Sequence, residues 1–294
     1  MRRGFSGAHS CGRRIHVARD TSFYYSFLVL PAAQRRAIVA VWDFCRAVDD
    51  AVDEAPVDRR AAQVQAWREE LARCFEGRLP GTPQGRALQP LITDFNLSRQ
   101  PFDSLIEGVD MDLHTTRYAT FADLHEYCIR VASAVGLMCV EIFGCRDLES
   151  RQYAIDLGVA LQLTNILRDV PGDLERGRVY IPLEDFARFG CREGDLGAES
   201  IHAGHGVRSP AVRQLLAFQA QRARDYYKRA DAVLPRRHAR RLVAARIMGA
   251  IYFGILKRIE ARNYDVFSEV IRVPRTQRAL IAAATWARTA LTGR

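Results

Sequence analysis

Two pairs of aspartates, each pair spaced four residues apart, are the residues in this sequence whose type and spacing best suit chemistry. The pairs are Asp49 with Asp53 and Asp169 with Asp173. Mg²⁺ prefers hard oxygen ligands, and proteins usually hold it with one or two carboxylates together with the phosphates of a substrate. One such pair is common by chance, whereas two pairs with flanking arginines predict a cage for metal ions that bridge a diphosphate.

Arginines accompany both pairs. Arg46 precedes the first pair, and Arg176 and Arg178 follow the second pair, with Tyr180 close behind. The planar guanidinium group suits a bidentate grip on phosphate oxygens. The chain as a whole has only two lysines, Lys228 and Lys257, so a coding bias toward arginine would also explain this abundance.

The first pair falls on a predicted helix over residues 31–54. Its core-facing stripe consists of apolar residues at helical spacing, and Asp49 lies inside that stripe. A buried carboxylate is costly without a positive partner, and acids at a helix C-terminus oppose the macrodipole. The simpler interpretation is that these acids end a helix and face water, but their position favours a cation.

The second pair begins at the end of another predicted helix, over residues 152–170, which is apolar around most of its circumference. Against that background Gly158, Gln162, Asn165 and Asp169 form one narrow polar stripe. Taken alone, such a stripe is an ordinary solvent-facing surface; the alternative is the wall of a polar cavity. Proline removes a helical donor, so Pro171 predicts a break that leaves Asp173 on an irregular turn.

The elements that must position these residues are predicted to be helices throughout. The chain has 294 residues, 48% of them hydrophobic, and the apolar spacing is helical almost everywhere. Loops are expected at residues 77–85, 171–177, 190–210 and around Pro274. We expect a loose basic arm over residues 1–19 and one all-α domain over residues 20–294.

Composition excludes several classes of protein. The longest apolar run, residues 134–140, is far shorter than the roughly 20 residues that span a bilayer. Seven cysteines without a C-x-x-C pair suggest neither a zinc site nor a disulfide framework, so a cytoplasmic location is expected. The net charge is +9, but no nucleic-acid motif accompanies it, and we expect no nucleic-acid partner.

Beyond these patterns, five stretches resemble the squalene and phytoene synthase family of head-to-head prenyltransferases. They are SFYYSFLVLP (residues 22–31), FCRAVDDAVDE (44–54), RVASAVGL (130–137) and LQLTNILRDV with RGRVYIPLEDFARFG (161–170 and 176–190). Within the family, EGVDMDL, RVASAVGL and EIFG look most like bacterial presqualene diphosphate synthases of hopanoid pathways. Pro171, Trp42 and Ile129 depart from the usual family residues.

The resemblance implies an all-α isoprenoid synthase fold, a single helical domain around a central cavity. It also implies that the four aspartates face one another across the cavity and hold several Mg²⁺ ions bridging the diphosphates. Carried over by position, the implied substrate-binding residues are Ser22, Phe23, Arg46, Gln162, Asn165, Arg168, Arg178 and Tyr180. The implied catalytic residues are Arg46, Arg168 and Tyr127, and Tyr127 or released diphosphate is our hypothesis for the proton acceptor.

The implied reaction joins two farnesyl diphosphates to presqualene diphosphate, with release of diphosphate. NADPH is not expected. Phytoene, dehydrosqualene or squalene synthase remain alternatives, and a non-catalytic scaffold protein is an alternative of another class. Expected partners are the two substrate molecules and downstream isoprenoid enzymes, and the greasy products suggest peripheral contact with the inner face of the membrane.

Two further groups of residues have ordinary structural explanations. Large apolar residues at helical spacing pack in a core more often than they line a cavity. This applies to Phe23, Leu137, Met138, Val159 and Leu163. Asp110 and Asp112 are expected to cap a helix end or to pair with Arg117 rather than to bind metal.

Overall fold

The computed structural model describes residues 24–197 and 209–292, and the part of the chain so described is helical, with only an isolated bridge between Arg117 and Val179. The predicted arm, residues 1–19, lies outside the described residues. The helices are α1 (Tyr24–Phe27), α2 (Ala32–Asp53), α3 (Val57–Phe75), α4 (Pro83–Asp94), α5 (Gln100–Met111), α6 (Phe121–Cys128), η1 (Ile129–Ser133), α7 (Ala134–Ile142), α8 (Leu148–Glu175), α9 (Leu183–Arg188), η2 (Glu193–Leu196), α10 (Pro210–Val233), η4 (Arg236–His238), α11 (Val243–Ala261) and α12 (Arg275–Thr292).

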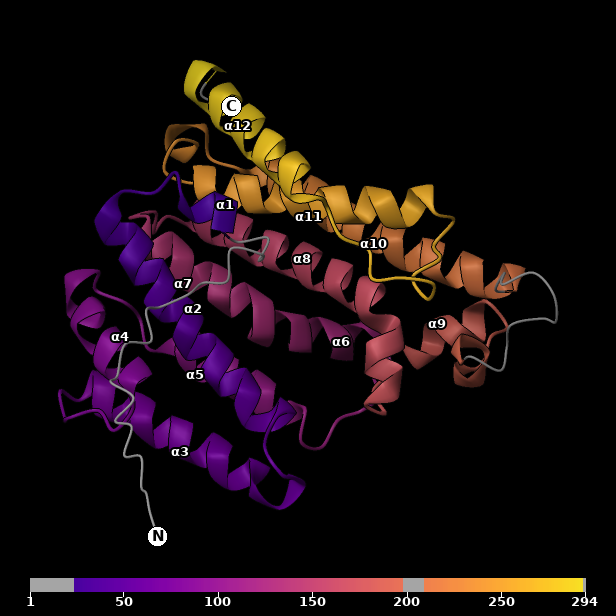
Figure 1. Cartoon of the computed structure of the whole chain (residues 1–294), viewed down its shortest axis with the longest axis horizontal. Helices are drawn as coiled ribbons and strands as arrows, with labels where there is room; N and C mark the ends of the chain where they lie inside the picture. Colours follow the sequence, from indigo (N-terminus) through magenta and orange to yellow (C-terminus); the bar gives the residue numbers. More distant parts are fainter. Residues whose placement is uncertain (1–23, 198–208, 293–294) are drawn as a thin grey trace, which may run out of the picture.

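The centre of the molecule is α8, a helix of 28 residues (Figure 1). It packs against α10 along much of its length and also against α7, η1, α11 and α6. A helix that is apolar around most of its circumference can be stable only when other helices cover it on several sides, and α8 satisfies that requirement. Its first turn is capped by Asp147, whose side chain accepts the Ser150 N–H at 3.0 Å.

The two helices that were predicted to carry the aspartates are present, with one difference. Helix α2 has the predicted extent within two residues. Helix α8, however, continues through Pro171 to Glu175, so the predicted break and the predicted loop over residues 171–177 are wrong. Val170 is buried and Leu174 packs against the core, and this packing outweighs the roughly 3 kcal/mol that an internal proline costs.

Close packing between η1, α7 and α8 shapes the middle of the fold. A Cβ atom on Gly158 would lie 2.6 Å from Ser133 Cα, and one on Gly136 would lie 2.8 Å from the Ala154 carbonyl oxygen. The Ser133 hydroxyl donates to the Ile155 carbonyl at 2.8 Å, which fixes the contact. Residues 129–133 form a π-helical turn, a feature that often occurs at functional sites.

The remaining helices enclose this centre. Helices α3 and α4 cover one side of α2, while α11 and α12 lie on the opposite edge of the molecule, with α12 outermost (Figure 1). All six described cysteines are free. Within the described residues, no helix is both long enough and apolar enough to cross a membrane.

Candidate active site

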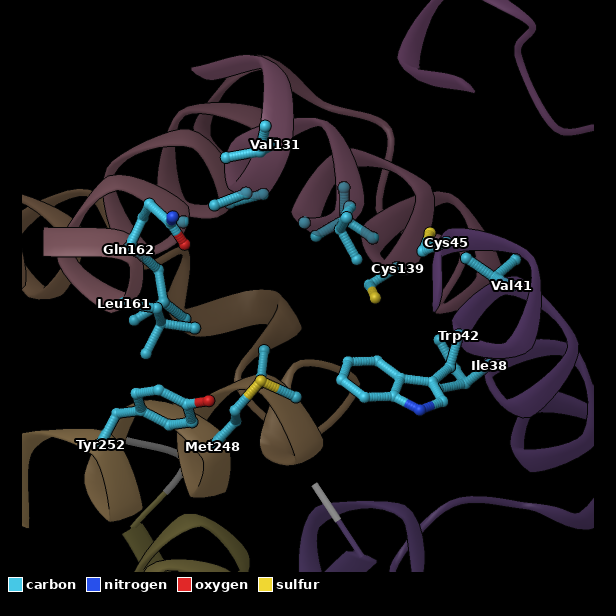
Figure 2. Close-up of a pocket in the computed structure, with 18 of the residues that line it drawn as sticks. Ile38, Val41, Trp42, Cys45, Val131, Cys139, Leu161, Gln162, Met248 and Tyr252 are labelled. Atoms are coloured by element: carbon cyan, nitrogen blue, oxygen red, sulfur yellow. The ribbon is translucent and has the colours of Figure 1, made fainter. Parts of the chain in front are cut away.

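A cavity of about 370 Å³ lies between α2, η1, α7, α8 and α11. Its walls are mostly apolar, and Figure 2 shows Trp42 and Cys139 facing Leu161 and Met248 across the hollow. A pocket of this size that is apolar with a few polar groups is typical of a small-molecule site.

Most polar side chains that line the cavity come from α2 and α8. They are Arg46, Asp49, Gln162, Asn165 and Arg168. The stripe of α8 therefore lines a cavity, and the simpler solvent-facing interpretation is wrong for Gly158, Gln162 and Asn165. Asn165 Oδ1 is buried and has no hydrogen-bond partner among the described residues, so it presents a free oxygen acceptor at the site.

Asp49 lies where the apolar stripe of α2 meets this polar group. Burial raises the pKa of Asp49 to about 7, and the nearby carboxylates of Asp53 and Asp112 add to the rise, while Arg46 opposes it. The charged form is thus short of positive partners in the protein alone. Asp50 is directed outward and pairs with Arg46 at 3.2 Å, as expected for the solvent side of the helix.

Asp53 and Arg178 join the two motif regions. Arg178 Nη1 donates to Asp53 Oδ1 at 2.9 Å, although 125 residues separate them. Only 11% of the Arg178 side chain is exposed, compared with 47% for Asp53, so the guanidinium group is held in a largely closed environment. The structure therefore brings the end of α2 to the segment after α8.

The second pair, Asp169 and Asp173, lies on the last turns of α8. Asp169 accepts two hydrogen bonds from Arg168, its neighbour in the chain. Burial raises the pKa of Asp173 to about 7, with a further contribution from Asp169, while Arg176 and Arg178 lower it. Because α8 continues through Pro171, the two carboxylates remain one helical turn apart on the same face.

Asp112 is the residue of this region that the sequence argument misjudged. Its carboxylate accepts a hydrogen bond from Tyr127 Oη and another from Tyr180 Oη, each at 3.0 Å. Asp112 does end α5, as expected, but the predicted pairing with Arg117 is wrong, since Arg117 pairs with Glu193 at 2.8 Å. Burial raises the pKa of Asp112, and Arg178 is the largest opposing influence.

The two tyrosines that meet at Asp112 also contact each other. The rings of Tyr127 and Tyr180 stack with centroids 5.2 Å apart, and Tyr118 stacks on Tyr180 at 5.8 Å. Burial raises the pKa of Tyr127 well above its ordinary value, and the charge of Asp112 adds to the shift. Tyr127 is therefore held as a neutral phenol that donates a hydrogen bond to Asp112.

Helix α11 supplies a wall that the sequence argument did not identify. Ala244, Ala245, Met248 and Tyr252 line the cavity from this side. Burial alone would lower the pKa of the Arg168 guanidinium, but Asp169, and to a smaller extent the hydrogen bond with Tyr252, raise it. Nothing in the local sequence of α11 distinguishes these residues from ordinary core.

The large apolar residues that were expected to pack in the core do so wherever the structure describes them. Leu137, Met138, Val159 and Leu163 are buried in the main apolar cluster and do not line the cavity. Ser22 and Phe23 lie outside the described residues. Within the described chain, no three His, Cys, Asp or Glu side chains are gathered closely enough to hold a metal ion by themselves.

The sequence model of the squalene/phytoene synthase family matches residues 17–279. The chain belongs to this family. Its members are prenyltransferases, and this chain is a prenyltransferase of the squalene/phytoene synthase family with an all-α isoprenoid synthase fold. The motifs read from the sequence, including both aspartate pairs, fall within the matched region.

Relatives of this prenyltransferase carry two kinds of name. A 15-cis-phytoene synthase of Synechococcus elongatus is 39% identical, covering 92% of this chain and 89% of that protein. A presqualene diphosphate synthase of Rhodopseudomonas palustris is 37% identical, covering 84% of this chain and 86% of that protein. The relatives thus agree on the family and differ in the product.

Solved structures of related enzymes share the fold. A dehydrosqualene synthase in complex with a ligand aligns with a TM-score of 0.78 and 28% identity over 92% of each chain. A squalene synthase from Alicyclobacillus acidocaldarius aligns with a TM-score of 0.72 and 34% identity, over 82% of this chain and 89% of that one.

Proposed function

We propose that this prenyltransferase condenses two molecules of farnesyl diphosphate head-to-head to presqualene diphosphate, with Mg²⁺ as its cofactor and without NADPH. The observation that carries the proposal is one cavity with an apolar body and a polar end formed by Arg46, Asp49, Asn165 and Arg168. An apolar body suits a prenyl chain, and arginines beside carboxylates suit a metal diphosphate.

The donor set fits Mg²⁺. Asp49, Asp53, Asp169 and Asp173 offer hard carboxylate oxygens, and the raised pKa values of Asp49 and Asp173 reflect carboxylates that lack sufficient positive charge around them. The described residues form no closed cluster of three ligands, which is expected where substrate phosphates complete the coordination. When bound, Mg²⁺ would supply charge neutralisation of the departing diphosphate.

The chain's own residues bind and orient the substrates. Arg168 is aligned by Asp169 and Tyr252, and Arg178 by Asp53, so both guanidinium groups are arranged before a substrate arrives. Preorganised cations of this kind stabilise charge that develops in the transition state. The amide side chains of Gln162 and Asn165 lie beside Arg168 on α8 and are suited to donate to diphosphate oxygens.

The apolar walls would exclude water from the allylic cation that forms when diphosphate leaves. For the final proton loss we favour released diphosphate as the acceptor over Tyr127. The Tyr127 hydroxyl already donates to Asp112, and its raised pKa works against formation of a phenolate. Full turnover by Tyr127→Phe would agree with this choice, and loss of turnover with retained folding would favour the tyrosine.

Three bulky rings at one end of the cavity favour a C15 over a C20 substrate. Phe27, Phe143 and Tyr153 line the cavity. Gln34 Nε2 donates to the Ile142 carbonyl at 3.2 Å, which places Phe143 beside the first turn of α2, whereas Asp49 lies near its last turn. Phe143 therefore lies at the end of the cavity opposite the carboxylates. Phe27 precedes α2 by a few residues and Tyr153 lies about four turns before Asp169 on α8, which places both rings toward the same end.

Phytoene synthase activity, with geranylgeranyl diphosphate as substrate, is the second candidate. The 39% identity to the phytoene synthase of Synechococcus elongatus favours it. The two candidates share the polar end of the cavity and differ in how long a chain the apolar end accepts.

Product analysis by mass spectrometry tests the proposal. The purified protein is incubated with farnesyl diphosphate and Mg²⁺, with and without NADPH, in parallel with geranylgeranyl diphosphate. We expect a C30 cyclopropyl diphosphate without NADPH, its loss in EDTA and in Asp49→Asn, and its retention in the exposed control Asp58→Asn. A C40 product would favour the second candidate, and squalene formed only with NADPH would contradict the cofactor assignment.

A further inference from the structure

The last helix, α12, carries large apolar residues on its solvent side as well as on its buried side, where Ile281 and Ala282 pack against α11. Its buried side carries Arg278 and Thr289, which are 8% and 1% exposed. Its outer side carries Leu280, Trp286 and Leu291, which are 69%, 53% and 85% exposed. A helix that faces only water normally places its large apolar residues inward, so this outer face requires a different explanation.

Apolar residues that are exposed or partly exposed form a continuous face on α12. Leu280, Ala284, Ala287 and Leu291 follow one another at spacings of four, three and four residues, which keeps them on one side of a helix. Trp286 lies on the flank of the helix, about 120° around from Leu280, and the exposed Ala283 lies between it and the stripe. The helix has 18 residues and is about 27 Å long, and it lies at one edge of the molecule (Figure 1).

The segment that carries this face bears charged residues of one sign. Residues 270–294 contain no aspartate or glutamate and five arginines, at positions 272, 275, 278, 288 and 294. The nearest acid before them, Glu269, pairs with Arg262. Arg240, just before α11, donates to the Ala290 carbonyl at 3.1 Å and adds another cation beside the last turn of α12.

We propose that the exposed face of α12 docks on the surface of an anionic lipid bilayer. A helix with leucine and tryptophan on its outer face, bordered by arginines, lies in the interface with its apolar side in the acyl boundary and its cations among the headgroups. A second copy of the chain is a poorer occupant. Two copies meeting through α12 would bring two arginine-rich, acid-free segments together.

Docking through α12 would place the bilayer close to the apolar end of the cavity. Helix α1 lies against both α11 and α12. The Arg278 guanidinium lies 5.7 Å from the centre of the Tyr25 ring, and Phe27, two residues further, lines the cavity. A bilayer under α12 would thus lie beside the short helix that closes the apolar end of the cavity. Release of a long prenyl product into the bilayer rests on the proposed function, whereas the docking itself does not.

Vesicle flotation of the full chain tests the proposal. We expect binding to vesicles that contain phosphatidylglycerol, weak binding to pure phosphatidylcholine, and weaker binding at high salt. The double variant Leu280→Ser, Leu291→Ser should bind about tenfold less tightly, because two apolar side chains no longer enter the bilayer. The matched control is Leu79→Ser, Leu148→Ser, since both leucines are 85% exposed on other helices and loops.

Tryptophan fluorescence adds a readout that does not depend on activity. The chain has three tryptophans, Trp42, Trp67 and Trp286. Anionic vesicles should shift the emission to shorter wavelength in the parent protein and not in Trp286→Phe, which should still float. Circular dichroism and turnover of detergent-dispersed substrate should be unchanged in the double variant. Flotation and fluorescence do not require turnover, so they test the docking even if the proposed function fails.

Two results would overturn the docking proposal. The first is equal flotation of the double variant and its control, which would assign any binding to another surface. The second is self-association in analytical ultracentrifugation that the double variant abolishes, without vesicle binding by the parent, which would make a second copy the occupant of this face.

Discussion

The hydrogen bond from Arg178 to Asp53, 2.9 Å long, connects two motifs that lie 125 residues apart. It fixes the end of α2 against the segment that follows α8. Arg178 is also close enough to Asp112 and Asp173 to lower the pKa of each. One guanidinium group therefore balances carboxylates from three parts of the chain.

Replacement of Arg178 should impair catalysis far more than replacement of its neighbour Arg176. Arg178→Gln removes a preorganised cation, so we expect kcat/KM to fall about 100-fold. Arg176 is 61% exposed and lies 3.8 Å from Asp173, so Arg176→Gln should lower kcat/KM less than about threefold. Steady-state kinetics with farnesyl diphosphate measures both, and similar losses in the two variants would contradict the special role of Arg178.

The sequence predicted the two main helices and most of the cavity's polar end. Asp49 could be recognised because a carboxylate inside an apolar stripe is costly unless it faces a polar cavity. Gln162 and Asn165 could be recognised because they interrupt an otherwise apolar helix. In each case the signal lies within one helix, where periodicity specifies which residues share a face.

The rest of the site depends on contacts between distant segments. Asp112 meets tyrosines that lie 15 and 68 residues further along the chain, so its spacing alone resembles an ordinary helix end. Tyr252 acts through Arg168, 84 positions earlier, for the same reason. Pro171 misled the prediction because local propensity was outweighed by packing of α8 against its neighbours.

Asp112 should contribute more to stability than Asp110, although the two lie on the same turn. Asp112→Ala would leave the buried hydroxyls of Tyr127 and Tyr180 without their acceptor, and we expect a loss of about 2–4 kcal/mol in the free energy of unfolding. Asp110 pairs with Arg68 at 3.1 Å in a half-exposed position, so Asp110→Ala should cost less than about 1 kcal/mol.

Urea denaturation of both variants gives these free energies. A double-mutant cycle between Asp112→Asn and Tyr180→Phe then isolates the hydrogen bond between the two side chains. Additive effects of the two substitutions would show that the carboxylate does not hold the tyrosine.

Shortening the side chain of Phe143 should shift substrate preference toward longer prenyl chains. Phe143→Leu opens the end of the cavity beside the first turn of α2, so the ratio of kcat/KM for geranylgeranyl diphosphate to that for farnesyl diphosphate should rise about tenfold. Phe186→Leu is the matched control, because Phe186 is equally buried at 4% exposure and does not line the cavity. An unchanged ratio in Phe143→Leu would remove this ring from the determinants of chain length.

The stability of the α3–α4 connection should depend on the ionised form of Glu70. The carboxylate is 2% exposed and accepts hydrogen bonds from the Gly81 N–H at 2.9 Å, the Thr82 N–H at 2.7 Å and the Thr82 hydroxyl at 2.7 Å. Burial alone would raise the pKa of Glu70, but these hydrogen bonds and that of Arg73 outweigh it and lower the pKa below its ordinary value.

A carboxyl group with a lowered pKa in the folded state stabilises the fold above its unfolded pKa, and this stabilisation is lost as the pH falls through the lowered value. Glu70→Gln should therefore lower the free energy of unfolding by about 2 kcal/mol at pH 7. The difference from the parent protein should begin to shrink as the pH falls below the ordinary glutamate pKa of 4.5. Urea denaturation between about pH 3.5 and pH 7, a range that includes the titration of ordinary glutamates, measures this difference.

The control is Glu76→Gln, because the exposed Glu76 carboxylate pairs with Arg78, and it should show little difference from the parent at any pH. A loss of stability in Glu70→Gln that does not change with pH would mean that the shape of the side chain, and not its charge, holds this connection.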